Sequence, residues 1–187
     1  MTRAGVCAAA TWLLVVQGAS GIDALGQALP PPRDGDIRVL YYELPKETTV
    51  WLTLEPKSPE GKPLPMGMFF TLNLHFAGKQ PKAPVEQVEL RAHVGLLWAP
   101  RVEVWFLLDD RDRIDLTPKS FVGLISGDAW NYLPTNVPVT TLTQIAQAKR
   151  VTGNALGVEF ELTESQVRAI HAFLDRVLSD NPAQFGK

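Results

Sequence analysis

Apolar and polar side chains alternate along most of this chain, and that period of two constrains the fold more than any other feature of the sequence. In the segment 66–77, the apolar residues that share one face are Met68, Phe70, Leu72, Leu74 and Phe76. Successive side chains of a strand point to opposite faces of a sheet, so the segment is predicted to be a half-buried strand. Similar patterns predict further strands at 39–44, 48–55, 85–94, 101–108, 114–116, 121–126, 137–142 and 158–162.

The connections between these strands are rich in proline and glycine, as expected of turns. We expect the segments 56–65, 78–84, 95–100 and 127–136 to be loops. The stretch 143–157 is open to two interpretations. Residues 144–149 would tolerate a helical turn, whereas Gly153 and Asn154 suggest the tip of a hairpin.

The period changes near the end of the chain, where a helix is predicted over 164–179. Thr163 is followed three residues later by Gln166, which is the pattern of a capping box. Apolar residues then recur at spacings of three and four, which places them in one stripe along a helix. They are Val167, Ile170, Phe173, Leu174, Val177 and Leu178.

These patterns predict a mainly β (α+β) fold: an antiparallel β-sandwich or a partly closed barrel with one C-terminal amphipathic helix. Trp51, Phe69, Trp105 and Leu107 lie on the side of their strands opposite the predicted core. Either these strands are buried on both faces or they display an aromatic patch. The terminal helix could cover some of them, because its apolar stripe needs a partner.

The N-terminal residues 1–21 have the pattern of a cleavable secretory signal peptide. Arg3 supplies the positive end, residues 4–16 are apolar, and small residues follow. The apolar run is shorter than the roughly 20 residues that a membrane-spanning helix needs, which favours a cleaved signal over the two alternatives, an uncleaved membrane anchor and a buried helix. Once the signal is cleaved, we expect no transmembrane segment. We expect a Pro/Gly-rich leader or linker at 22–36, a single β-rich domain at 37–179 and a loose tail at 180–187.

Composition narrows the function classes. Residues 22–187 carry 17 basic and 20 acidic side chains, which gives no electrostatic footprint for nucleic acid. The one cysteine, Cys7, lies within the predicted signal, so no thiol catalysis, thiolate metal site or disulfide is expected in the mature chain. A cysteine-free exported domain fits a periplasmic or secreted bacterial protein.

Candidate catalytic and metal-binding residues have simpler explanations. The acidic cluster Asp109, Asp110, Asp112 and Asp115 lacks the spacing of a calcium loop and is interleaved with Arg111 and Arg113. The three histidines, His75, His93 and His171, are expected to be exposed or hydrogen-bonded separately. Ser126 lacks the Gly-x-Ser-x-Gly elbow of a nucleophile. We therefore predict no catalytic residue, no metal site and no cofactor, and the sequence inclines against an enzyme.

The aromatic residues give the more positive signal. Trp98, Trp130 and Tyr132 fall in predicted loops, where binding residues are common, and aromatic side chains bring large contact areas with polar edges. The leading hypothesis is an exported, non-catalytic binding or accessory domain of the bacterial envelope, with another envelope protein or macromolecule as its partner. A carrier of a small apolar ligand in a β-walled cavity is the alternative, and an envelope hydrolase is the weakest hypothesis.

Overall fold

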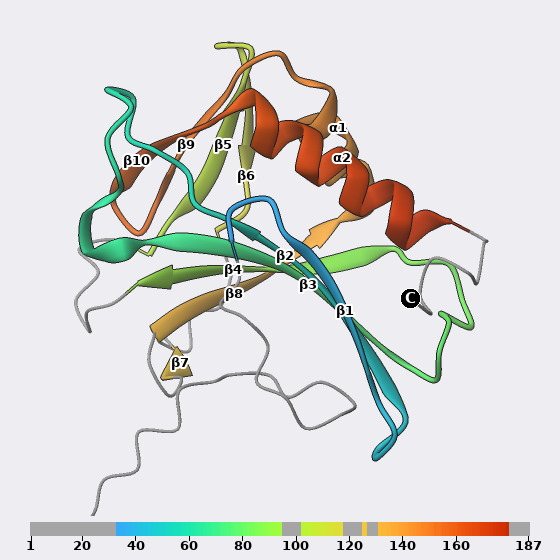
Figure 1. Cartoon of the computed structure of the whole chain (residues 1–187). Coiled ribbons are helices and arrows are strands. Elements are labelled where there is room, and N and C mark those ends of the chain that lie inside the picture. Colours follow the sequence, from blue (N-terminus) through green and yellow to red (C-terminus); the bar gives the residue numbers. More distant parts are fainter. Residues whose placement is uncertain (1–32, 95–101, 118–124, 127–130, 180–187) are drawn as a thin grey trace, which may run out of the picture.

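The computed structural model describes residues 33–94, 102–117, 125–126 and 131–179, which form two antiparallel sheets and two helices (Figure 1). The six-stranded sheet has the order β1-β2-β3-β4-β8-β7 and the four-stranded sheet the order β10-β9-β5-β6. The strands of the first sheet are β1 (Ile37–Tyr42), β2 (Glu47–Leu54), β3 (Phe69–Ala77), β4 (Gln87–Val94), β7 (Ile125–Ser126) and β8 (Asn131–Pro138). Those of the second are β5 (Val104–Leu108), β6 (Asp112–Asp115), β9 (Val151–Ala155) and β10 (Val158–Leu162). The helices are α1 (Val139–Gln147) and α2 (Glu164–Leu178).

The predicted fold class, mainly β with an antiparallel sandwich, is confirmed. Neither sheet closes on itself, so the barrel alternative does not apply to the described strands. The smaller sheet and both helices lie over one face of the six-stranded sheet (Figure 1). We call this the inner face and the opposite side of the six-stranded sheet the outer face. No described helix is long and apolar enough to cross a membrane.

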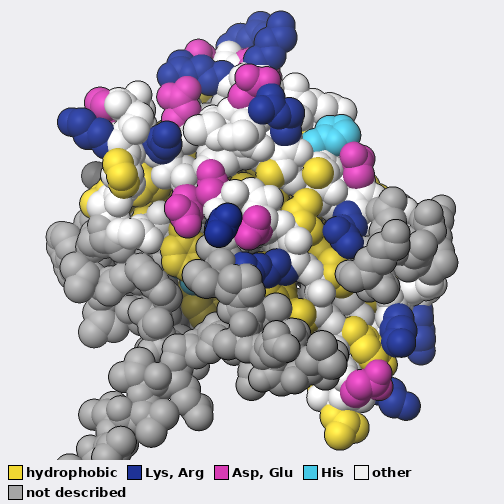
Figure 2. Space-filling view, in the orientation of Figure 1, with side chains coloured by type: hydrophobic (Ala, Val, Ile, Leu, Met, Phe, Trp, Pro, Cys, Tyr) yellow, Lys and Arg dark blue, Asp and Glu magenta, His cyan; other side chains and the backbone are white. Residues whose placement is uncertain are grey.

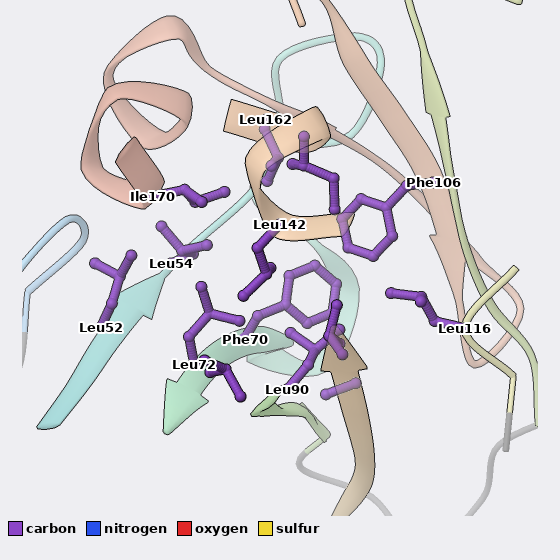
Figure 3. Packing of buried hydrophobic residues seen from close by; sticks show 14 of the residues in the cluster. Leu52, Leu54, Phe70, Leu72, Leu90, Phe106, Leu116, Leu142, Leu162 and Ile170 are labelled. Carbon is purple, nitrogen blue, oxygen red and sulfur yellow. The ribbon is translucent and has the colours of Figure 1, made fainter. Parts of the chain in front are cut away.

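The predicted alternation places the core residues on the inner face. Leu52 pairs with Leu72 across β2 and β3, Leu72 pairs with Leu90 across β3 and β4, and all three are buried. Figure 3 shows these side chains pointing toward Phe106 of β5, Leu142 of α1 and Ile170 of α2. Burying one such side chain contributes about 1.5–3 kcal/mol, so this layer is the main source of stability.

Three phenylalanines join the two sheets. The rings of Phe70 and Phe106 meet the ring of Phe160 edge to face, with centroids 4.9 and 5.2 Å apart. An apolar space between the sheets and helices, lined by residues such as Leu72, Phe106 and Ile170, holds only about 10 Å³. That volume is about one water molecule, so this space has no room for a small-molecule ligand.

The C-terminal helix forms as its sequence predicts. The Thr163 side chain accepts a hydrogen bond from the Gln166 backbone N–H at 3.3 Å, and the Gln166 side chain accepts one from the Thr163 N–H at 2.9 Å. This is the predicted capping box. The apolar stripe of α2 faces the core together with α1, so the helix covers the inner face and leaves Trp51 and Phe69 on the outer face half-exposed.

Several predicted boundaries are wrong between the fourth strand and β9. The segment 137–142, predicted as a strand, is split: β8 ends at Pro138 and α1 begins at Val139. Leu142 and Ile145 are buried at a spacing of three, and the Thr143 hydroxyl donates to the Val139 carbonyl at 2.9 Å. These local contacts favour a helix over a continued strand. The described residues therefore form two α-helices where one was predicted.

Two turns also differ from their predicted positions. The β9–β10 hairpin turns at Leu156 and Gly157, both with positive φ, and not at Gly153-Asn154. The Asn154 side-chain oxygen accepts a hydrogen bond from the Gly157 backbone N–H at 3.0 Å. Asn154 is therefore a residue of β9 that stabilises the turn following this strand. The predicted loop 127–136 contains the first six of the eight residues of β8, which pairs with β4 along its length.

Candidate functional site

Tyr132 is the one predicted binding residue that the structure describes, and it lies on a strand and not in a loop. It is part of β8, where it pairs with His93 of β4. Trp98 and Trp130 lie outside the described residues. The site is therefore built from the surroundings of Tyr132 on the outer face.

An aromatic row crosses three neighbouring strands at this position. His93 pairs with Phe69 of β3, and their rings are stacked with centroids 4.3 Å apart and planes 4° apart. On its other side His93 meets the Tyr132 ring at a centroid distance of 5.4 Å. Phe69, His93 and Tyr132 are each half-buried, so part of every ring in the row is accessible at the surface. We call these three residues the aromatic row.

Charged and polar groups flank the aromatic row. The Arg91 guanidinium lies over the Tyr132 ring at 4.8 Å and forms an ion pair with Glu89 at 2.6 Å. Such a cation–π contact adds about 0.5–1 kcal/mol at a partly exposed site. The Arg91 guanidinium is therefore positioned by two contacts, one with the Tyr132 ring and one with the Glu89 carboxylate.

A hydrogen-bonded chain supports the row from the next positions of β3. The Asn73 amide donates to the Thr71 hydroxyl at 2.8 Å, and that hydroxyl lies 3.0 Å from His93 Nε2. Burial of the ring, followed by the charge of Arg91, lowers the pKa of His93 from its usual 6.5 to about 4. The ring is neutral at neutral pH, and Nε2 can accept the proton of Thr71.

A groove of about 470 Å³ adjoins the aromatic row, and Phe69 forms part of its wall. It lies between the end of the β2–β3 pair and the connection that joins them. The lining residues are Thr53, Glu55, Pro56, Lys57, Pro63, Leu64, Gly67, Met68 and Phe69. Thr53 is only 2 % exposed, and its hydroxyl has no hydrogen-bond partner among the described residues. We call this space the Thr53 groove.

The remaining histidines are separate, as predicted. His75 Nδ1 lies 3.0 Å from the Thr49 hydroxyl. Burial, followed by the charge of Arg91, lowers the pKa of His75. His171 contacts Asp175 one turn further along α2, where both side chains are more than half exposed. Neither histidine lines the Thr53 groove.

Two residues of the acidic cluster, Asp109 and Asp110, are bonded to the segment Lys149–Arg150. Arg150 contacts Asp110 at 2.9 Å and Glu161 at 3.1 Å, while Asp109 accepts two backbone N–H groups. Within the described residues no three His, Cys, Asp or Glu side chains are grouped to hold a metal ion. Positive and negative side chains are intermingled on the face drawn in Figure 2. That face has no stripe of a single charge that would suit nucleic acid.

The sequence pointed to Tyr132 and Phe69 but not to the residues that join them. Phe69 stood out because it lies off the core face of its strand, and Tyr132 because it is aromatic. Arg91, His93 and Thr53 belong to the site through the pairing of β2, β3, β4 and β8. Only the register of these strands brings them together.

The chain was compared with protein-family models, curated proteins and solved structures. None of the three comparisons found a significant match.

Proposed function

We propose that the protein is an exported, non-catalytic binding or accessory domain of the bacterial envelope, and that its outer face contacts another protein or macromolecule. One observation carries the proposal: the aromatic row and the Thr53 groove share Phe69, so a set of aromatic rings and a preformed groove adjoin each other, with the Arg91 guanidinium beside the rings. Aromatic and arginine side chains beside a preformed groove are typical of binding surfaces.

Catalysis is less well supported by the same residues. The Thr71 hydroxyl and His93 are within hydrogen-bond distance, as a nucleophile and its base would be. A base is most effective when its pKa lies near the working pH, however, and the pKa of His93 is about 4. The Thr71 hydroxyl also accepts from Asn73, so it is already engaged in a hydrogen-bonded chain within the sheet.

A carrier function is less well supported as well. A drug-sized ligand needs a cavity of about 300–1,000 Å³. The enclosed space between the described parts of the two sheets and the helices holds about 10 Å³. The Thr53 groove is large enough, but it opens on the surface at the end of two strands and is a site for contact with a larger partner.

The N-terminal residues 1–21 support export of the protein from the cytoplasm. The charged, apolar and small-residue parts of 1–21 follow one another in the order of a secretory signal. Intact-mass analysis of the protein from a periplasmic fraction should give a chain that lacks about the first 21 residues. Full-length protein in the cytoplasmic fraction would contradict export.

Affinity capture with the mature domain as bait tests the binding function. Wild-type protein and the variants Tyr132→Ala and Arg168→Ala are incubated with envelope extract, and captured molecules are identified by mass spectrometry. Arg168 is exposed on α2 and is the surface control. We expect one set of partners with wild type and Arg168→Ala, and at least tenfold less of it with Tyr132→Ala. Equal capture by all three proteins would contradict a contact through the outer face. A double variant, Trp98→Ala/Trp130→Ala, tests in the same way the two predicted binding residues that lie outside the described part of the chain.

A further inference from the structure

We propose that the tip of the β1–β2 hairpin, residues 42–47, inserts into the headgroup region of a zwitterionic phospholipid membrane, with Leu44 as the residue that enters deepest. This contact goes beyond the proposed outer-face function and is separate from the aromatic row, because Glu47 pairs with Ala77 at one end of β3 and Phe69 begins the other end. We call residues 42–47 the hairpin tip. Its exposure, its rigidity, its charges and its shape carry the proposal.

The hairpin tip exposes apolar side chains at its apex. Leu44 is 89 % exposed and Tyr42 is 41 % exposed, and together they are two of the three exposed large hydrophobic residues in the described part of the chain. Pro45 beside them is exposed as well. The hairpin projects from the sheets (Figure 1), and an apolar side chain lies at its end with acidic and basic ones beside it (Figure 2). Single exposed leucines are common on protein surfaces, but a group of apolar residues at the end of a projection can leave water together.

The hairpin tip is held in place before any membrane is met. The Gly78 backbone N–H donates to the Lys46 carbonyl at 2.7 Å, and the Thr48 hydroxyl donates to the Gly78 carbonyl at 2.6 Å. The Lys79 ammonium lies over the Tyr41 ring, 5.0 Å from its centroid. These contacts join the tip to the segment that follows β3. An ordered tip loses little conformational entropy on insertion, which favours binding.

The charges around the apex decide which lipid surface fits. Glu43, Lys46 and Glu47 are exposed in the tip, and Lys79 is exposed beside it, so two negative and two positive charges balance. A zwitterionic headgroup presents a phosphate for the lysines and an ammonium for the glutamates. Nucleic acid or a strongly anionic membrane attracts surfaces with an excess of basic residues, which the tip does not have.

The shape of the hairpin tip favours a membrane over a protein partner. A specific protein–protein interface takes about 20–30 residues from each side, and most of its binding energy comes from side chains that fill pockets. The turn at 43–46 is a narrow projection with Leu44 at its apex. Lipid headgroups close around such a projection and remove its apolar atoms from water without a preformed pocket.

A matched pair of leucine variants tests the proposal. Leu44 and Leu178 are the exposed leucines of the described residues, and Leu178 ends α2. Wild type, Leu44→Ser and Leu178→Ser are sedimented with vesicles of phosphatidylcholine and phosphatidylethanolamine. We expect wild type and Leu178→Ser to bind equally, and Leu44→Ser to bind about tenfold more weakly because a buried leucine is lost. All three should melt at the same temperature, since both leucines are exposed. Equal vesicle binding by wild type and Leu44→Ser would overturn the proposal.

A fluorescent label tests insertion itself. The chain without residues 1–21 has no cysteine, so Leu44→Cys and Leu178→Cys each offer one thiol for a polarity-sensitive dye. With zwitterionic vesicles, we expect the emission of the dye at position 44 to shift to the blue, and the dye at position 178 to keep its emission in water. An unchanged emission at position 44, or the same shift at both positions, would overturn the proposal.

Other ligands of the hairpin tip would also be recognised. Raising the salt from about 0.1 to about 0.5 M should change vesicle binding less than twofold, because the charges of the tip balance. Binding only to vesicles of phosphatidylglycerol, lost at the higher salt, would overturn the proposal in favour of an electrostatic contact. A captured protein that is lost with Leu44→Ser, with no vesicle binding by wild type, would overturn it in favour of a protein partner. Tyr132→Ala should bind vesicles as wild type does, so the two proposals fail independently.

Discussion

Gln166, in the first turn of α2, donates its side-chain amide to the carboxylate of Asp34, at 2.9 and 3.0 Å. The two residues are 132 positions apart in the chain. The same amide donates to the Glu55 carbonyl at 2.8 Å, and Asp34 accepts the Glu55 N–H at 2.8 Å. One side chain therefore caps its own helix and ties that helix to the segments before β1 and after β2.

Replacement of Gln166 by alanine should destabilise the protein by about 2–3 kcal/mol. The side chain is only 1 % exposed, so its removal leaves the Thr163 N–H, the Asp34 carboxylate and the Glu55 carbonyl short of a partner. Urea denaturation followed by circular dichroism measures the change. Arg168→Ala on the same helix is the control and should change stability by less than about 0.5 kcal/mol, because its pair with Glu164 is exposed. Equal losses of stability for Gln166→Ala and Arg168→Ala would show that the hydrogen bonds of Gln166 to Asp34 and Glu55 do not stabilise the fold.

Asp109 should be replaceable by asparagine but not by alanine. Its Oδ1 accepts the backbone N–H groups of Lys149 and Arg150, both at 2.9 Å, and the residue has a φ of 51°. Asparagine keeps an acceptor oxygen and tolerates this conformation, whereas alanine does neither. We expect a loss of about 1–3 kcal/mol for Asp109→Ala and less than half of that loss for Asp109→Asn in urea denaturation. A similar loss for both variants would show that the charge and not the acceptor matters.

Gly153 should not accept a side chain. A Cβ at this position would overlap the Trp105 carbonyl oxygen and lie 2.6 Å from Cζ of Phe160, inside the core. Both neighbours are held, one by the β5–β9 pairing and the other by the phenylalanine cluster. Gly153→Ala should therefore cost about 3 kcal/mol or prevent folding, which is the upper end of the loss at overpacked core positions, because one of the clashes is with backbone.

Gly61→Ala is the matched control for that change. Gly61 has a φ of +77°, and a Cβ there would meet nothing within 4 Å. The backbone strain alone should cost about 1 kcal/mol, and the variant should fold. Thermal melting of both proteins measures the difference. Melting temperatures within a few degrees of each other would mean that the β5–β9–β10 region can shift to admit the extra methyl.

The elements that sequence predicted well are those whose pattern is local. The alternation around Leu72 defines β3 because one face of that strand is buried, and Thr163 with Gln166 marks the start of α2 because the cap is closed within four residues. The boundary at Pro138 was missed for the opposite reason. Val137 and Val139 fit a strand by alternation, and only packing against the core shows that the second of them begins a helix.

The candidate site could be predicted only in part, because its residues meet through strand register. Tyr132 is aromatic and Phe69 lies off the core face, so both could be singled out. Their common neighbour His93 joins them only because β4 lies between β3 and β8 in this register. A shift by one residue would turn His93 to the inner face. No local pattern specifies that the Thr53 hydroxyl is buried without a partner.

Stability should rise with pH through the range in which His93 titrates. The pKa of His93 is about 4 in the folded protein, against 6.5 in an unfolded chain, so between these values the unfolded state binds more protons. Acidification from pH 7 to 4.5 therefore draws the protein toward the unfolded state. The full effect of the His93 ring is on the order of 3 kcal/mol. The pKa of His75 is lowered as well and acts in the same direction.

Urea denaturation at half-unit steps from pH 7.5 to 4.5 measures this dependence. His93→Phe, which keeps a ring against Phe69, should remove most of the slope, and His75→Phe should leave the larger part of it. Hydrogen bonds from Thr117 lower the pKa of the Asp115 carboxyl. The contribution of this carboxylate to stability is therefore lost only below the pH range of the measurement and does not affect the slope. A slope unchanged in His93→Phe would mean that the ring is not desolvated, and that the aromatic row is more open to water than its contacts with Phe69 and Tyr132 require.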